Sequence, residues 1–294
     1  QEELAQELHY WRQHAPFSHI TDISPGHGGV SLMAPLKQGF LLNHCIKIGH
    51  RILWRVSQFK CNDFKKLEKQ LLGIPWNYFV GEGSPQWKVS SQSSRLFHKK
   101  NIEEACELTF SKYRSGQPVR SNASTESTSI FVRFENNICT ISVDTTGEHL
   151  HKRGYKVYST EAPLRENLAA GLIYKFLNSL GENFQPGELV DPFCGSGTVI
   201  GEAHYLKSPL FFRKFAHQHF FIIRHIERFG LKELKSLPLP PPLFLSYFAS
   251  DKSEKAMLAC KENLKNIETV RFQTQALSDV EYSPAHQPVY VLTN

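Results

Sequence analysis

One short run of residues combines a carboxylate with two closely spaced glycines: Asp191-Pro192-Phe193-Cys194-Gly195-Ser196-Gly197-Thr198. It follows the apolar pair Leu189-Val190, so the pattern predicts the end of a buried strand, a tight turn and the start of a helix. Glycine lets the backbone turn sharply and approach a ligand, and the first turn of a helix offers unpaired amides and a positive dipole end. We therefore expect a nucleotide-like ligand at this turn.

The residues around the turn exclude two common phosphate-binding motifs. A P-loop needs a lysine after its second glycine, and Thr198 stands there instead. A dinucleotide fingerprint needs glycine or alanine where this chain has Ile200. Cys194 could serve as a nucleophile, but no base accompanies it in the sequence, so a small residue that fits a tight turn is the favoured interpretation.

Two more polar residues are expected at strand ends of the same sheet. Asp251 follows the apolar stretch 244–250 and could accept hydrogen bonds from both hydroxyls of a ribose, or simply support the dipole of the next helix. Asn294 follows the predicted strand 289–293. An asparagine amide oxygen can accept a proton of an exocyclic amine and orient its lone pair, although an asparagine that merely ends a strand is the plain alternative.

Two basic stretches could contact nucleic acid. The first, Ser94–Lys100, contains Arg95, His98, Lys99 and Lys100; the second, Gly147–Lys156, contains His149, His151, Lys152 and Arg153. Clusters of this kind hold phosphates, although a solvated basic turn is the commoner use of such a run. The two together favour RNA binding.

Composition sets broad limits. The chain has 294 residues, 40% of them hydrophobic, and a formal net charge of +6, which is compatible with a nucleic-acid partner but does not require one. The six cysteines are scattered without a C-x-x-C pair, so we expect no metal and no disulfide framework. Reduced thiols and the lack of a long apolar run predict a cytoplasmic protein with no membrane partner.

Periodicity predicts a mixed α/β and α+β chain of three blocks. The first contains a helix from Glu2, strands at Ile20–Ile23 and Gly29–Met33, a helix from Leu36 to Gly49 and a strand at His50–Phe59. The second has helices Asp63–Leu72 and Ile102–Tyr113, strands Trp87–Ser91, Ser129–Phe134 and Cys139–Val143, and a loop at Pro118–Thr128. The third is an α/β block, with a helix from Pro163 to Leu180, strands at 188–191, 244–250, 270–275 and 289–293, and an aromatic insertion, Phe211–Phe229, for which packing is slightly favoured over RNA contact.

These motifs, in this order, resemble the bacterial 23S ribosomal RNA guanine 2-amino methyltransferases that carry a THUMP domain. The resemblance rests on Gly28–Ser31, Ser94–Leu96 with His98, Gly147–Tyr155, Ala162–Ala170 and Asp191–Thr198. It implies an N-terminal ferredoxin-like part at 1–60, a THUMP-like RNA-binding domain at 61–156 and a partial Rossmann-like class I methyltransferase domain at 157–294.

The resemblance also implies the cofactor and its binding residues. S-adenosylmethionine would be held through its methionine part by Asp191, Gly195 and Gly197, together with Pro192, Phe193 and Thr198. The segment with Pro163, Arg165, Glu166 and Asn167 would close over it. Asp251 would bind the ribose and Asn294 the target amine. Arg95, His98, Lys99, Lys100, His151, Lys152 and Arg153 would bind ribosomal RNA.

The chain also departs from the family pattern. Two prolines and an aromatic residue usually follow the asparagine, and an acidic residue usually follows the third strand; here Asp279 is the nearest acid. We therefore expect these 294 residues alone to be inactive. The alternatives left open are methylation of a transfer RNA guanine, methylation of a DNA adenine, and an RNA-binding fragment without catalysis.

Overall fold

The computed structural model describes residues 1–81, 83–116, 127–161, 163–223, 226–238 and 240–294. Most of the predicted loop Pro118–Thr128, and Ala162 of the predicted cofactor segment, lie outside these residues. The chain divides into two compact units, and each contains one four-stranded sheet. The first unit consists of Gln1–His50, His149–Arg213 and Glu233–Asn294, and the second of Arg51–Glu148 and Lys214–Lys232.

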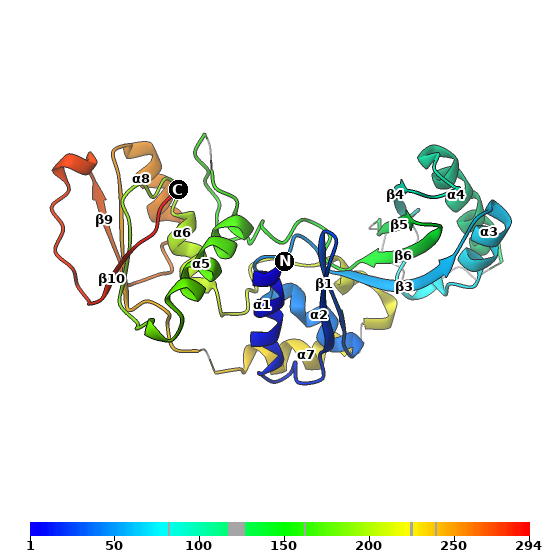
Figure 1. Ribbon diagram of the computed structural model, residues 1–294, viewed down its shortest axis with the longest axis horizontal. Helices are drawn as coiled ribbons and strands as arrows, with labels where there is room; N and C mark the ends of the chain where they lie inside the picture. The colour runs from blue at the N-terminus through cyan, green and yellow to red at the C-terminus, as the bar shows by residue number, and fades with distance from the viewer. Residues whose placement is uncertain (82, 117–126, 162, 224–225, 239) are drawn as a thin grey trace. The chain divides into compact units, whose positions relative to one another are not determined.

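The sheet of the first unit is parallel throughout. Its strands are β7 (Glu188–Asp191), β8 (Ser246–Asp251), β9 (Val270–Thr274) and β10 (Val289–Val291), in the order β10-β7-β8-β9. Parallel neighbours need crossover connections, and the helices α5 (Glu166–Leu180), α6 (Thr198–Tyr205) and α8 (Glu254–Asn263) accompany these strands (Figure 1). This is the doubly wound α/β arrangement that the sequence predicts.

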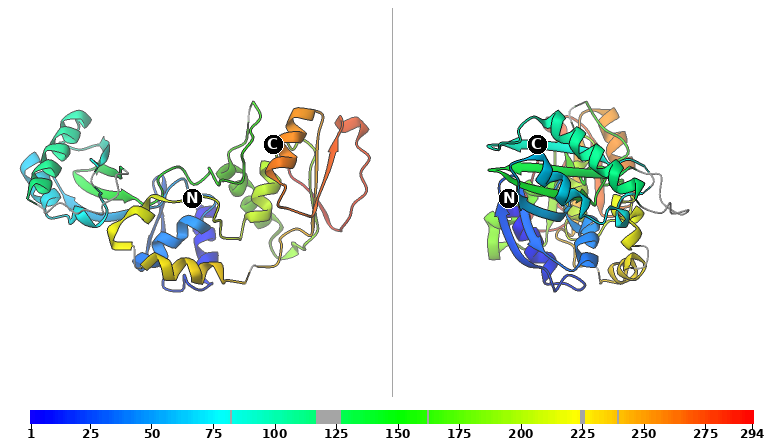
Figure 2. Two further views of the ribbon diagram at one scale, coloured as in Figure 1. Left: turned by 180° about the vertical axis from the view of Figure 1, so that it is seen from behind. Right: turned by 90° about the vertical axis from the view of Figure 1, so that its right-hand side faces the viewer.

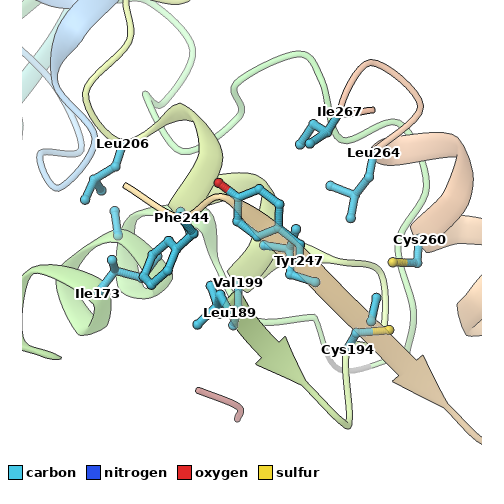
Figure 3. Packing of buried hydrophobic residues seen from close by; sticks show 14 of the residues in the cluster. Ile173, Leu189, Cys194, Val199, Leu206, Phe244, Tyr247, Cys260, Leu264 and Ile267 are labelled. Carbon is cyan, nitrogen blue, oxygen red and sulfur yellow. The ribbon is translucent and has the colours of Figure 1, made fainter. Parts of the chain in front are cut away.

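The core of this sheet comes from apolar residues on strands and helices. The Phe244 and Tyr247 rings lie beside Leu189 of β7 and Val199 of α6, each with 4% or less of its surface exposed (Figure 3). β7 and most of β8 are buried, as expected for central strands of a parallel sheet with both faces covered. The core fixes β7 and β8 in register, and their carboxyl ends therefore share one edge.

The N-terminal residues belong to this unit. They form α1 (Glu2–Arg12), β1 (Thr21–Gly26), β2 (Gly29–Met33) and α2 (Leu36–Cys45), and α1 contacts α5. The Glu7 carboxylate is fully buried and accepts hydrogen bonds from the backbone amides of Lys47 (2.6 Å) and Ile48 (3.1 Å). Burial raises the pKa of Glu7 to about 7. This N-terminal part of the first unit ends at His50, whereas the sequence predicts an N-terminal part that ends at residue 60.

The second unit has a mixed sheet. Its strands are β3 (Leu53–Lys60), β4 (Gln86–Gln92), β5 (Ser129–Glu135) and β6 (Ile138–Asp144), in the order β3-β6-β5-β4. β4 and β5 are parallel and joined through α4 (Lys99–Ser115), which packs beside α3 (Phe64–Leu72) over the sheet (Figure 2). Asp63 caps α3 by accepting a hydrogen bond from the Lys66 amide (2.8 Å).

A tight hairpin and the insertion complete the second unit. Asn136 and Asn137, with φ of 49° and 63°, turn β5 into β6, because asparagine tolerates the left-handed region that such turns need. The described part of the insertion packs as the sequence analysis favours: Phe215 and Phe220 are buried, and the Ala216 amide donates to Thr146 O. The remaining elements are η1 (Trp76–Tyr78), η2 (Gly181–Asn183), η3 (Ala216–His219), η4 (Phe221–Ile223), α7 (Ile226–Lys235) and η5 (Leu277–Asp279).

Two further observations concern the helices. α5 begins at Glu166, three residues after the predicted start at Pro163. Within the described ranges, every helix is too short or too polar to span a bilayer.

Candidate functional site

The carboxyl ends of β7, β8 and β10 bring three predicted residues to one edge of the parallel sheet. Asp191 ends β7 and Asp251 ends β8. β10 runs beside β7, and the Leu292 amide donates to Val190 O (3.0 Å). The Thr293 hydroxyl then donates to Asp191 Oδ1 (2.7 Å), so the adjacent Asn294 lies at the same edge. In doubly wound sheets this is the edge where ligands bind.

The glycine turn follows Asp191, and its two glycines have different roles. Gly195 and Gly197 have φ values of 52° and 82°, which residues with a side chain rarely adopt. A Cβ at Gly197 would lie 2.8 Å from Cys260 Sγ, so this glycine allows α6 to pack against α8. A Cβ at Gly195 would meet only Thr160 Oγ1, at 3.8 Å. The backbone at Gly195 is therefore the part of the turn that a ligand could approach.

Two carboxylates hold the turn. Asp251 Oδ2 accepts a hydrogen bond from the Gly195 amide (3.0 Å) and its Oδ1 from the Ser253 amide (2.9 Å). Asp191 Oδ1 accepts from the Phe193 amide (3.2 Å). Asp191 is only 2% exposed, and burial raises its pKa to about 6. Phe193 itself is 53% exposed, so an aromatic ring stands at the rim of this turn.

The predicted cofactor segment is split between exposed and buried residues. Pro163 and Arg165 are exposed, whereas Glu166 and Asn167 are buried. Asn167 Nδ2 contacts His50 Nε2 (3.1 Å). Among the described residues, Asn167 Oδ1 has no hydrogen-bond partner although it is buried. A buried acceptor without a partner is uncommon, and here it marks a position that a ligand could occupy.

Lys156 and Asn263 connect the segments of this site, and the sequence analysis did not single them out. Lys156 Nζ donates to Leu164 O (3.1 Å) and to Thr198 Oγ1 (2.8 Å) and lies 3.5 Å from Glu166 Oε1. It thereby ties the segment before α5 to the start of α6.

Asn263 on α8 is a second tie. Its Oδ1 accepts from the amides of Val157 and Tyr158, and its Nδ2 donates to Ser196 O in the glycine turn. No sequence signal distinguishes these two residues from surface lysines and helix-end asparagines, because their role depends on contacts between distant segments.

The first basic stretch lies in the second unit and is exposed. Arg95, Phe97, His98, Lys99 and Lys100 are all exposed, and only Leu96 is buried. The Arg95 amide donates to Asn137 Oδ1 (2.7 Å), which holds the loop against the β5–β6 turn. Lys99 and Lys100 form the first turn of α4, which has no acidic residue in its first turn. Cations at a helix N-terminus oppose the helix dipole, so an anion would be favoured there.

Residues 149–156 of the second basic stretch lie in the first unit, and its arginine is buried. Lys152 is exposed and His151 half-buried, but Arg153 is only 4% exposed. The Arg153 guanidinium donates to Glu202 (Nη2 to Oε2, 3.0 Å) on α6 and to Leu150 O (2.7 Å). Burial lowers the pKa of Arg153, but Glu202, with Tyr155 and Glu7, raises it above its ordinary value overall. The predicted RNA contact by Arg153 is therefore corrected: its donors are used inside the unit.

Comparisons with known proteins bear on this site. Residues 153–292 match the family model of the RMKL-like methyltransferase domain. This part of the chain is therefore similar to that family of domains. It includes the glycine turn, Asp251 and the segment before α5. The match agrees with the predicted methyltransferase family and supports S-adenosylmethionine as its cofactor, whereas the THUMP label stays a prediction.

Curated relatives and solved structures agree with this assignment. The chain is 31% identical over 185 residues to the ribosomal RNA large subunit methyltransferase K/L of Psychromonas ingrahamii (60% of this chain, 23% of the relative). It is 25% identical over 297 residues to that of Shewanella oneidensis (93% and 40%). The chain thus spans less than half the length of these relatives.

Two solved structures share the fold. One is a possible methylase from Clostridium difficile 630, with a TM-score of 0.75 and 22% identity, covering 99% of this chain and 76% of that one. The other, of a protein complexed with SAH, has a TM-score of 0.71 and 22% identity and covers 99% and 76%. They confirm the predicted Rossmann-like fold.

Proposed function

We propose that this protein is an S-adenosylmethionine-dependent RNA methyltransferase that modifies the exocyclic 2-amino group of a guanine in 23S ribosomal RNA. The observation that carries the proposal is the meeting of Asp191, Asp251 and the Thr293-Asn294 pair at one edge of the parallel sheet, around the glycine turn. The RMKL-like domain supports the reaction class. The names of the curated relatives support ribosomal RNA as the substrate.

The residues at this edge suit the cofactor. The Asp191 and Asp251 carboxylates match an ammonium group and a pair of ribose hydroxyls, and the exposed backbone at Gly195 permits close approach. Asn167 Oδ1 is a buried acceptor in the segment that would cover the cofactor. Lys156 and Asn263 hold that segment to the turn.

The chemistry follows from positioning. The cofactor supplies a methyl group on a sulfonium, which is a good leaving group. The exocyclic amine is a weak nucleophile because its lone pair is delocalised into the base. Asn294 Oδ1 would accept a hydrogen bond from the exocyclic amine and orient its lone pair, and orientation of this kind can supply a large share of a rate enhancement. Thr293, through its bond to Asp191, fixes the place of Asn294 beside the turn.

The first basic stretch is the part we assign to RNA. Lys99 and Lys100 offer charge at a helix N-terminus, where backbone amides also favour phosphate. The exposed Phe97 and His98 rings have centroids 4.0 Å apart, and exposed aromatic rings stack on unpaired bases. His151 and Lys152 stay assigned to RNA binding only as predictions from the resemblance.

Calorimetry with S-adenosylmethionine tests the enzyme proposal. We expect one binding site, and a large loss of affinity in the Asp251→Ala variant, because it removes both a ribose acceptor and the acceptor of the Gly195 amide. Glu182→Ala, an exposed carboxylate in η2, is the matched control and should bind as the parent does. Undiminished binding by folded Asp251→Ala would refute the assigned site.

A second experiment separates the substrates. Filter binding of ribosomal RNA, transfer RNA and duplex DNA across a range of salt concentrations should favour ribosomal RNA, because salt removes the nonspecific phosphate contribution. A preference for duplex DNA at every salt concentration would favour an adenine amino-methyltransferase instead.

A further inference from the structure

Three histidines from distant parts of the sequence come together in the first unit. His50 follows α2, and His149 and His151 precede the segment that contains Arg153. One possible ligand atom from each lies within 4.8 Å of the other two. The lack of a C-x-x-C pair among the cysteines predicts no metal site. Only the fold places His50 beside the H-x-H pair.

The backbone around the cluster is held by hydrogen bonds. The Leu150 amide donates to His50 O (2.9 Å), and Leu150 is buried between the two other histidines. Arg213 Nη1 donates to His149 O (2.7 Å), and the Arg153 amide donates to His151 O (2.9 Å). The three side chains therefore start from fixed positions, so only their own torsions need to change on binding an ion.

The three imidazole rings already lie close to one another. Those of His149 and His151 are nearly parallel, with centroids 5.5 Å apart, and that of His50 stands edge-on to both, at 5.9 and 6.1 Å. Asn167 Nδ2 contacts His50 Nε2 and orients that ring. Nitrogens bound to one tetrahedral zinc at 2.0–2.1 Å lie about 3.4 Å apart. Side-chain rotations that move ring atoms by about 1 Å therefore suffice to form such a site.

One ring nitrogen of the cluster forms no hydrogen bond with the described residues. His151 Nδ1 is buried and has no hydrogen-bond partner among the described residues. Leaving a buried polar atom unpaired is unfavourable, and a ligand at this point would offset that cost. This second observation separates the cluster from a chance gathering of histidines.

The donor set selects the kind of ion. Imidazole nitrogens suit zinc, copper, nickel and cobalt, whereas magnesium and calcium need oxygen ligands. Two guanidinium groups act on His151 and oppose a cation. The charge of Arg153, however, is balanced by Glu202, and Arg165 is exposed and screened by solvent.

We propose that His50, His149 and His151 form a binding site for a divalent transition-metal ion, with zinc as the expected occupant. Three protein ligands leave a fourth position open to water or another group, as in open zinc sites. The site does not depend on the methyltransferase proposal.

Metal titration of the full chain tests the site. After dialysis against a chelator, we expect one equivalent of Co²⁺ to give the visible ligand-field absorption of a four-coordinate site with three nitrogen ligands. Zn²⁺ should displace the bound Co²⁺. His50→Ala and His151→Ala should each lower Zn²⁺ affinity, measured by competition with a chromogenic chelator, by on the order of 100-fold. Asn167→Ala should lower it about tenfold, as expected for a group that orients a ligand.

The matched control is His27→Ala, an exposed histidine in the turn between β1 and β2. It should leave Zn²⁺ affinity unchanged, and circular dichroism should show that every variant is folded. The proposal is overturned if the parent binds no stoichiometric Co²⁺ or Zn²⁺. It is also overturned if the double variant His50→Ala/His151→Ala binds as the parent does, or if His27→Ala loses as much affinity.

Discussion

The two basic stretches of this chain place their arginines in opposite environments: Arg95 is exposed and Arg153 is buried. Ser94–Lys100 lies in the second unit with its charged side chains exposed, and the charges of Lys99 and Lys100 stand where a helix dipole disfavours them. The stretch around Arg153 lies in the first unit, and its guanidinium is enclosed by Glu202 and backbone carbonyls. A run of basic residues therefore predicts anionic partners. Whether these partners are phosphates outside the protein or carboxylates inside it depends on the fold.

The segment around Arg153 supports the candidate site indirectly, through its contacts with α6. Glu202 lies on α6, the helix that begins at the glycine turn. Its carboxylate accepts hydrogen bonds from the Arg153 guanidinium and from the Tyr155 hydroxyl (2.9 Å). The segment continues to Lys156, which bonds Thr198 at the start of that helix. The second basic stretch thus supports the candidate cofactor site, whereas the first is available to a partner.

Arg153→Ala should produce the largest effect. It leaves the Glu202 carboxylate buried without its cation, and breaking such a pair destabilises a protein by about 3–5 kcal/mol. Urea unfolding measures this loss. Arg95→Ala, which removes an exposed arginine of the first stretch, should change stability by less than about 0.5 kcal/mol. If Arg153→Ala were as stable as the parent but bound RNA weakly, the two stretches would have the same role and the comparison would fail.

The sequence predicts the parallel sheet and its strand-end residues well, for a local reason. Strand, turn and helix signals around Asp191 and Asp251 lie within a few residues of each other, and the edge of a parallel sheet brings them together. The burial of Arg153, the ties made by Lys156 and Asn263, and the meeting of His50 with His151 all depend on segments distant in the chain. Periodicity and composition contain no information on those contacts.

Gly201→Ala should have the next largest effect. A Cβ at this position of α6 would lie 2.8 Å from the Tyr155 ring, so the segment that contains Tyr155 must shift away from the helix. Overpacking of this kind costs about 1–3 kcal/mol. Gly171→Ala in α5, where a Cβ meets nothing within 4 Å, should instead gain about 0.5–1 kcal/mol. Thermal unfolding of the two variants decides the matter: equal effects would mean that Tyr155 does not pack closely on α6.

The pH dependence of cofactor binding should be a smaller effect. Burial raises the pKa of Asp191 to about 6, so the carboxylate ionises as the pH rises from about 5 to about 7. The cofactor has positive charge, and its affinity should therefore rise about tenfold over that range. Because the unfolded chain ionises at a lower pH than folded Asp191, the contribution of this group to stability falls as the pH rises from about 4 to about 6.

Asp191→Asn serves as the comparison for this pH effect. It should flatten both profiles, measured by calorimetry and by urea unfolding at each pH. A pH dependence of cofactor affinity that persists unchanged in Asp191→Asn would assign the titration to another group.

The double substitution Lys99→Gln/Lys100→Gln should have the smallest effect on stability and should change only the affinity for RNA. Both side chains are exposed, so stability should stay within about 0.5 kcal/mol of the parent. RNA affinity should fall several-fold, and the slope of its logarithm against that of salt concentration should decrease by about 2, one for each phosphate contact. Lys65→Gln/Lys69→Gln removes the same charge from exposed positions on α3 of the same unit. If that control lowers RNA affinity equally, the contribution is one of net charge, and the N-terminus of α4 is not a specific RNA contact.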